Sequence, residues 1–101
     1  MIVHEFYDWL QNQSYPDTIN VDIKVLNLNE TSIDNQLKKT ICVNFENNSY
    51  IGRFIVWDDN SCFFELMKIE TETTLLHDRI DFMSLAELKS IYGNFIESII
   101  T

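Results

Sequence analysis

The sequence predicts an α+β fold in which an antiparallel meander of four to five strands is flanked by an N-terminal and a C-terminal helix. Apolar residues recur every three or four positions near both ends of the chain and every second position between them. Short polar turns separate the alternating segments, and strands joined in this way pair with their neighbours in the order α-β-β-β-β-β-α. With 101 residues the chain is expected to form a single domain, 1–101.

Residues 2–13 predict the first helix, because their apolar side chains fall on one helical stripe. Glu5 and Asp8 favour the N-terminal half of this helix electrostatically. Pro16 cannot continue a helix and stands in its exit turn. From residue 18 the apolar period changes to two, which is typical of a half-buried strand.

Five strands are expected in the middle of the chain, at about 18–25, 40–45, 49–57, 61–70 and 73–80. The first two are separated by residues 27–36, whose many Asn, Glu, Thr, Ser and Asp side chains predict a loop. The other connections are short turns at Asn47-Asn48, Asp58-Asp59-Asn60 and Thr71-Glu72.

The last helix is predicted to begin after Ser84. Ser84 and Glu87 occupy the N-cap and N3 positions of a capping box, and Met83 and Leu88 are placed to form a hydrophobic staple. A wide apolar stripe then continues to the end of the chain. Gly93 interrupts it at a cost of about 1 kcal/mol relative to Ala, for which close packing would be one reason.

Two hairpin registers assign the strand residues to the faces of the sheet. With Asn47-Asn48 as a two-residue type I′ turn, Phe45 lies opposite Tyr50. With a three-residue turn at 58–60, Arg53 lies opposite Glu65. One face, expected to lie under the helices, then collects Ile41, Val43, Phe45, Phe54, Val56, Cys62, Phe64 and Leu66. The other face collects Thr40, Cys42, Ile51, Arg53, Ile55, Trp57, Phe63, Glu65 and Met67.

The second face is more apolar than a solvent-facing sheet surface should be. One interpretation is a binding surface with aromatic anchors and a charged rim. The other is that a helix or the loop 27–36 covers this face, as in a three-layer α/β/α domain.

Charge and composition exclude several classes of function. Asp plus Glu number 16 against 7 Lys plus Arg, and the net charge of −9 disfavours nucleic-acid binding and suits a basic partner. Hydrophobic residues make up 46% of the chain, which excludes disorder. We expect a cytoplasmic protein without membrane contact, because no segment resembles a membrane span or a signal peptide.

No catalytic, cofactor or metal site is predicted. The chain has no glycine-rich phosphate loop, Cys42 and Cys62 lack metal-ligand spacing, and His4 and His77 stand alone. The cysteines are expected to be free thiols, because they point to opposite faces of strands two apart. Two acidic pairs, Asp58/Asp59 and Glu70/Glu72, are solvated turn residues, weak cation ligands, or contacts for Lys and Arg of a basic partner.

Residues 50–98 resemble the TriTu-type immunity proteins of bacterial polymorphic toxin systems. The resemblance rests on a Gly-Arg-x-x-Val-Trp strand at 52–57, then Cys62-Phe63-Phe64-Glu65-Leu66, the acidic turn Glu70-Thr71-Glu72, His77, and the helix start Ser84-Leu85-x-Glu87-Leu88. Asp58-Asp59-Asn60 stands where a glycine would be expected after the tryptophan.

The resemblance implies a bacterial protein that binds and neutralises the toxin domain encoded beside it, delivered by contact-dependent growth inhibition or a secretion system. Many such toxins are nucleases with basic clefts, and the family has no catalytic residues. We expect the partner-binding residues to be Trp57, Asp58, Asp59, Phe63, Glu65, Glu70 and Glu72. The alternatives are a small acidic adaptor or secretion chaperone that holds a partner peptide on its sheet face, and an inhibitor that mimics nucleic acid.

Overall fold

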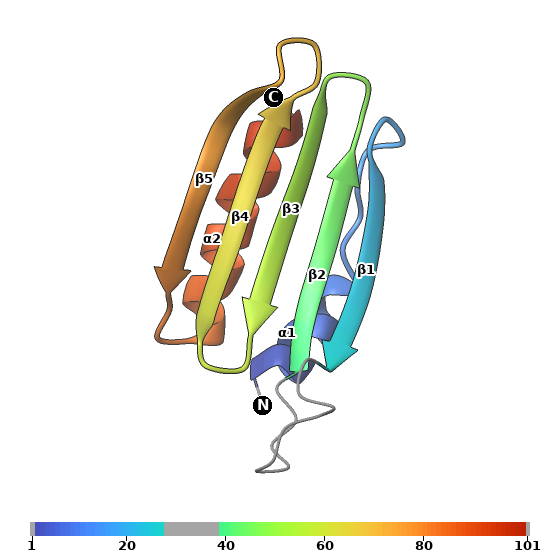
Figure 1. Cartoon of the computed structure of the whole chain (residues 1–101). Coiled ribbons are helices and arrows are strands. Elements are labelled where there is room, and N and C mark those ends of the chain that lie inside the picture. The colour runs from blue at the N-terminus through green and yellow to red at the C-terminus, as the bar shows by residue number, and fades with distance from the viewer. Residues whose placement is uncertain (1, 28–38, 101) are drawn as a thin grey trace.

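The computed structural model describes residues 2–27 and 39–100, so most of the expected loop 27–36 lies outside the described residues. The elements, in order, are α1 (Ile2–Leu10), β1 (Asn20–Asn27), β2 (Lys39–Glu46), β3 (Tyr50–Trp57), β4 (Ser61–Lys68), β5 (Thr73–Asp81) and α2 (Leu85–Ile100). The strands form one antiparallel sheet in the order β1-β2-β3-β4-β5 (Figure 1). The predicted α-β-β-β-β-β-α arrangement is confirmed.

Both helices pack on the same face of this sheet (Figure 1). Aromatic rings from both helices contact Phe54 of β3. The distance between ring centroids is 6.3 Å for Phe6 of α1, and 5.0 and 5.5 Å for Tyr92 and Phe95 of α2. The described elements therefore form two layers. A three-layer arrangement with a helix on each face is wrong.

The residues expected under the helices form the core. Seven of them are at most 2% exposed: Ile41, Val43, Phe45, Phe54, Val56, Cys62 and Leu66. Phe64, at the border of this core, is half-buried and stacks on Phe54 at a centroid distance of 5.8 Å. The sequence therefore predicted the inner face of the three central strands correctly.

The β3–β4 register is as predicted, with Arg53 opposite Glu65. In the three-residue turn between these strands, Asn60 takes the left-handed conformation that such loops use, with φ of 63°.

The predicted β2–β3 register is wrong by two residues, because Phe45 lies opposite Gly52 rather than Tyr50. Asn47 does not take a left-handed turn position. Its side-chain Oδ1 accepts hydrogen bonds from the backbone N–H groups of Ser49 (2.8 Å) and Tyr50 (2.7 Å). This contact moves the turn one residue along the chain. A shift of two in the pairing keeps every side chain on its predicted face.

The N-cap of α2 is confirmed, since the Glu87 N–H donates to Ser84 Oγ at 3.2 Å. The hydrophobic staple is wrong, because Met83 is 88% exposed while its neighbour Phe82 is buried. The Phe82 N–H donates to the Asn60 carbonyl (2.9 Å), which fixes Phe82 in the core and leaves Met83 facing solvent. At the other end of the chain, α1 ends at Leu10, three residues earlier than expected.

The connection after α1 is held onto α2 by two tyrosine hydroxyls. Tyr15 Oη and Tyr92 Oη lie 2.6 Å apart, and Tyr92 is 2% exposed. Burial raises the pKa of both hydroxyls, so both stay protonated and can share this hydrogen bond.

The two glycines have opposite surroundings. A Cβ at Gly52 would lie 3.2 Å from Phe95 Cζ and 3.3 Å from Leu66 Cδ1, so the missing side chain lets α2 approach β3 closely. A Cβ at Gly93 would meet nothing within 4 Å, so close packing does not explain this glycine.

Replacing Gly52 by Val should therefore lower the free energy of unfolding by about 1–3 kcal/mol through overpacking. Replacing Gly93 by Ala should raise it by about 0.5–1 kcal/mol, because Ala is the better helix former and has room. Urea unfolding followed by circular dichroism measures both. Equal effects of the two substitutions would contradict the assigned packing of α2 on β3.

Cys62 gives the stability a pH dependence. Burial raises the pKa of this thiol from 9.0 to about 11. Between these values the unfolded chain loses the proton and the native protein keeps it, so the free energy of unfolding falls as the pH rises, by about 2–3 kcal/mol in total. Urea unfolding from pH 8 to about 11 should show this loss in the parent. In Cys62→Ala the total loss should be smaller by this amount, and the buried hydroxyls of Tyr15 and Tyr92 should account for what remains. Parallel pH curves for the two proteins would show that Cys62 is not responsible.

Candidate functional site

The sheet face turned away from the helices, here called the open face, carries four rows of side chains that run across the strands. Row 1 consists of Asn20, Glu46, Ile51, Met67 and Thr74, and row 2 of Asp22, Asn44, Arg53, Glu65 and His77. Row 3 consists of Lys24, Cys42, Ile55, Phe63 and Arg79, and row 4 of Thr40, Trp57, Ser61 and Asp81. Neither helix covers these rows (Figure 1).

The open face has the apolar character expected from the sequence. Trp57, Phe63 and Ile55 are half-buried, and Ile51 and Met67 are 42% and 36% exposed. Arg53 Nη2 lies 2.7 Å from Glu65 Oε1, so the expected cross-strand pair is present. Because both members are exposed, the pair contributes at most about 1 kcal/mol.

The acidic turns lie at opposite ends of the open face. Asp58 and Asp59 follow row 4 in the β3–β4 turn, whereas Glu70 and Glu72 follow row 1 in the β4–β5 turn. The eight residues of β4 separate the two turns by about 26 Å at 3.3 Å per residue. The structure therefore brings Trp57 and Phe63 close to the first acidic pair and leaves the second at the far end.

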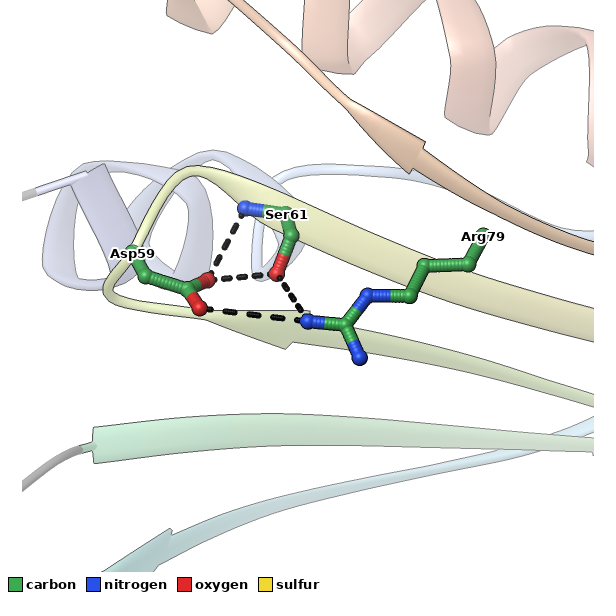
Figure 2. Close-up of polar contacts among 3 residues, drawn as sticks. All are labelled: Asp59, Ser61 and Arg79. Carbon is green, nitrogen blue, oxygen red and sulfur yellow. Dashed lines mark hydrogen bonds and ion pairs between the residues drawn. The ribbon is translucent and has the colours of Figure 1, made fainter.

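Arg79 of β5 joins the β3–β4 turn in a group that we call the turn cluster, made of Trp57, Asp59, Ser61 and Arg79. The guanidinium carbon of Arg79 lies 4.9 Å from the centroid of the Trp57 ring. Figure 2 shows Arg79 Nη2 between Ser61 Oγ (3.3 Å) and Asp59 Oδ2 (3.9 Å). Asp59 Oδ1 also accepts hydrogen bonds from the Ser61 N–H (3.2 Å) and from its hydroxyl.

The turn cluster changes the predicted roles of two residues. The Asp59 carboxylate is held by Ser61 and lies next to Arg79, so its charge is partly balanced within the chain. Trp57 already carries a cation on one side, and a partner ring or cation at that position would have to compete with Arg79.

Sequence reasoning missed Arg79. Its pairing with Phe63 depends on a bulge in β5: Leu66 of β4 pairs with Leu76 and Met67 with Thr74, so Leu75 has no partner in the ladder. Spacing along the chain does not reveal where such a bulge falls.

Neither cysteine has a reactive thiol. Burial raises the pKa of Cys42 and brings that of Cys62 to about 11, so neither thiol is activated as a nucleophile. Cys42 and Cys62 are both free thiols, as predicted. Within residues 2–27 and 39–100, no group of three His, Cys, Asp or Glu side chains could hold a metal ion. No helix in the same residues is long and apolar enough to cross a membrane.

The chain is thus a two-layer α+β domain with an aromatic, charged sheet face. The family model of the immunity protein TriTu matches residues 4–98, so the chain belongs to the TriTu immunity protein family. The resemblance predicted from residues 50–98 is confirmed, and the match extends it through β2, β1 and most of α1. No curated protein matches the chain. Family membership gives the general function, neutralisation of a protein toxin by binding, in a family that is generally non-enzymatic.

Replacing Arg79 by Ala should move the indole N–H resonance of Trp57 and leave that of Trp9 unchanged, because the guanidinium lies over the first ring alone. Replacing Lys89 by Ala is the matched control, since Lys89 Nζ lies 5.3 Å from the centroid of Trp9. Each change should cost about 0.5–1 kcal/mol of unfolding free energy. A Trp57 resonance that does not respond to Arg79→Ala would rule out the turn cluster in solution.

Proposed function

We propose that this protein neutralises its toxin by stoichiometric binding through the open face. The observation that carries the proposal is an apolar sheet surface, exposed at Ile51 and Met67 and not covered by either helix. Exposed apolar patches bordered by polar residues mark protein interfaces. The two acidic turns border this surface at both ends and would form its charged rim.

Trp57 and Phe63 are proposed as the anchors of the complex. They lie on adjacent strands in rows 3 and 4, are half-buried, and keep part of each ring available to a partner. Large aromatic side chains bury much area at little cost in conformational entropy, and interface energy concentrates in them. Glu65, next to Phe63 on the same strand but one row further along, would contribute charge together with its partner Arg53.

Charge supports a toxin with a basic surface. The chain carries 16 acidic residues against 7 Lys and Arg, and such an excess accelerates association with a basic partner by about 10- to 1000-fold. Asp58, Asp59, Glu70 and Glu72 would meet Lys and Arg of the partner at the rim. A nuclease domain is the toxin class proposed, because binding a phosphate backbone requires a basic surface.

The role is tested with the toxin domain encoded beside this protein. We expect co-expression to restore growth and the purified pair to form a one-to-one complex in which the toxin is inactive. Binding without protection would favour the secretion chaperone or adaptor. Absence of both binding and protection would make the immunity role wrong for this toxin.

The site is tested by binding kinetics at two ionic strengths. Asp58→Lys combined with Asp59→Lys should slow association by about 10-fold and weaken its salt dependence. Trp57→Ala should instead raise the dissociation rate by about 30-fold, the effect of losing a central anchor.

Matched controls lie away from the open face. Glu5→Lys with Asp8→Lys on α1 changes the net charge equally, and Met83→Ala removes an apolar side chain that is 88% exposed. Circular dichroism verifies that each variant folds. If the site variants fold and bind as their controls do, the toxin contacts another surface.

A further inference from the structure

A hollow of about 410 Å³ lies on the open face at rows 1 and 2, away from the turn cluster. The acidic side chains that line it are Asp22, Glu46 and Glu65, and Arg53 is its basic residue. Ile51 and Met67 supply apolar walls and are both exposed. Asp22 and Glu46 were not on the face or among the residues that the sequence predicted to bind a partner.

The charges in the hollow leave it negative. Arg53 is paired with Glu65 at 2.7 Å, so these two largely cancel. Asp22 has a longer contact of 3.6 Å with Lys24, and both of those side chains are 62% exposed, which makes the pair weak. The Glu46 carboxylate forms no hydrogen bond or ion pair with any residue that the structure describes. Asp22 and Glu46 therefore present two carboxylates to an incoming group.

Their positions suit one long cationic side chain. Asn20 pairs with Glu46 and Asp22 with Asn44, so Asp22 and Glu46 are diagonal cross-strand neighbours about 7–8 Å apart at Cα. A single cation between them can contact both carboxylates. Ile51 lies opposite Glu46 and Met67 opposite Ile51, so row 1 continues from the acidic end onto an apolar surface.

We propose that this hollow binds an arginine side chain from a basic segment of the toxin. The guanidinium lies between Asp22 and Glu46, and the aliphatic stem packs on Ile51 and Met67. Arginine suits both parts, because it buries its stem while its planar, weakly hydrated head donates in several directions. The proposal rests on the proposed function and adds the occupant and the residues that recognise it.

Other occupants fit the hollow less well. An apolar side chain would desolvate two carboxylates without giving them a partner. A second copy of this chain would bring a further charge of −9 against the same surface.

Toxin binding tests the proposal through Glu46→Lys, with Glu5→Lys as the control of equal charge change on α1. We expect the first substitution to weaken binding at least about 10-fold and the second less than about 3-fold, because only the first places a cation in the hollow. Equal losses of affinity would show that Glu46 acts through net charge alone and would overturn the proposal.

A probe that needs no toxin separates this proposal from the proposed function. The peptide acetyl-Gly-Arg-Gly-amide is titrated to tens of millimolar, and amide chemical shifts are followed in the parent and in Glu46→Gln. Acetyl-Gly-norleucine-Gly-amide and acetyl-Gly-Glu-Gly-amide are the matched controls. We expect the arginine peptide to shift the amides of Asp22, Glu46, Ile51 and Met67, with at least about a 3-fold weaker response in Glu46→Gln.

Three results would overturn the arginine site: no shifts in the hollow, equal shifts with norleucine, or a response unchanged in Glu46→Gln. A protein that binds the arginine peptide in the hollow but does not bind the toxin would instead overturn the proposed function alone.

Discussion

The packing of aromatic rings around Phe54 is the constraint on which the rest of the structure depends. Rings from both helices and from β4 meet this side chain, at centroid distances between 5.0 Å (Tyr92) and 6.3 Å (Phe6). Each such pair contributes about 0.5–1.5 kcal/mol beyond the area that it buries. Gly52 makes the arrangement possible, because Phe95 occupies the space that a side chain at this position would fill.

Because both helices pack on one side, no helix of the described residues covers the other side of the sheet. A sheet with one packed face usually has a polar opposite face, but here Ile51, Ile55, Trp57, Phe63 and Met67 occupy that position. Ile51 and Met67 are exposed and the other three are only half-buried, so a partner that covered this face would bury further apolar area. The TriTu immunity family implies a protein toxin as the partner, and we propose that the toxin binds this face.

The two halves of the open face differ in how their charges are arranged. At rows 3 and 4, Arg79 lies over Trp57 and next to Asp59, so the guanidinium, the carboxylate and the indole ring are partnered within the chain. At rows 1 and 2, Glu46 has no such partner among the described residues, and the surface is hollowed beside it. One half thus presents an aromatic ring and the other an unbalanced negative charge, and we propose that the two contact different parts of a basic partner.

The sequence by itself determined the elements and the faces of the three central strands. The spacing of apolar residues reflects the local geometry of a helix or a strand. A register shift of two residues leaves each side chain on the same face of the sheet. The wrong position predicted for the turn at Asn47 therefore did not change the predicted faces. Only the tertiary structure decided that both helices pack on the same face, because the second face is also apolar enough to be covered by a helix. It also decided that Arg79 lies over Trp57 and that Asp22 and Glu46 share one hollow. These contacts join residues far apart in the chain through strand pairing and a bulge, which local sequence patterns do not encode.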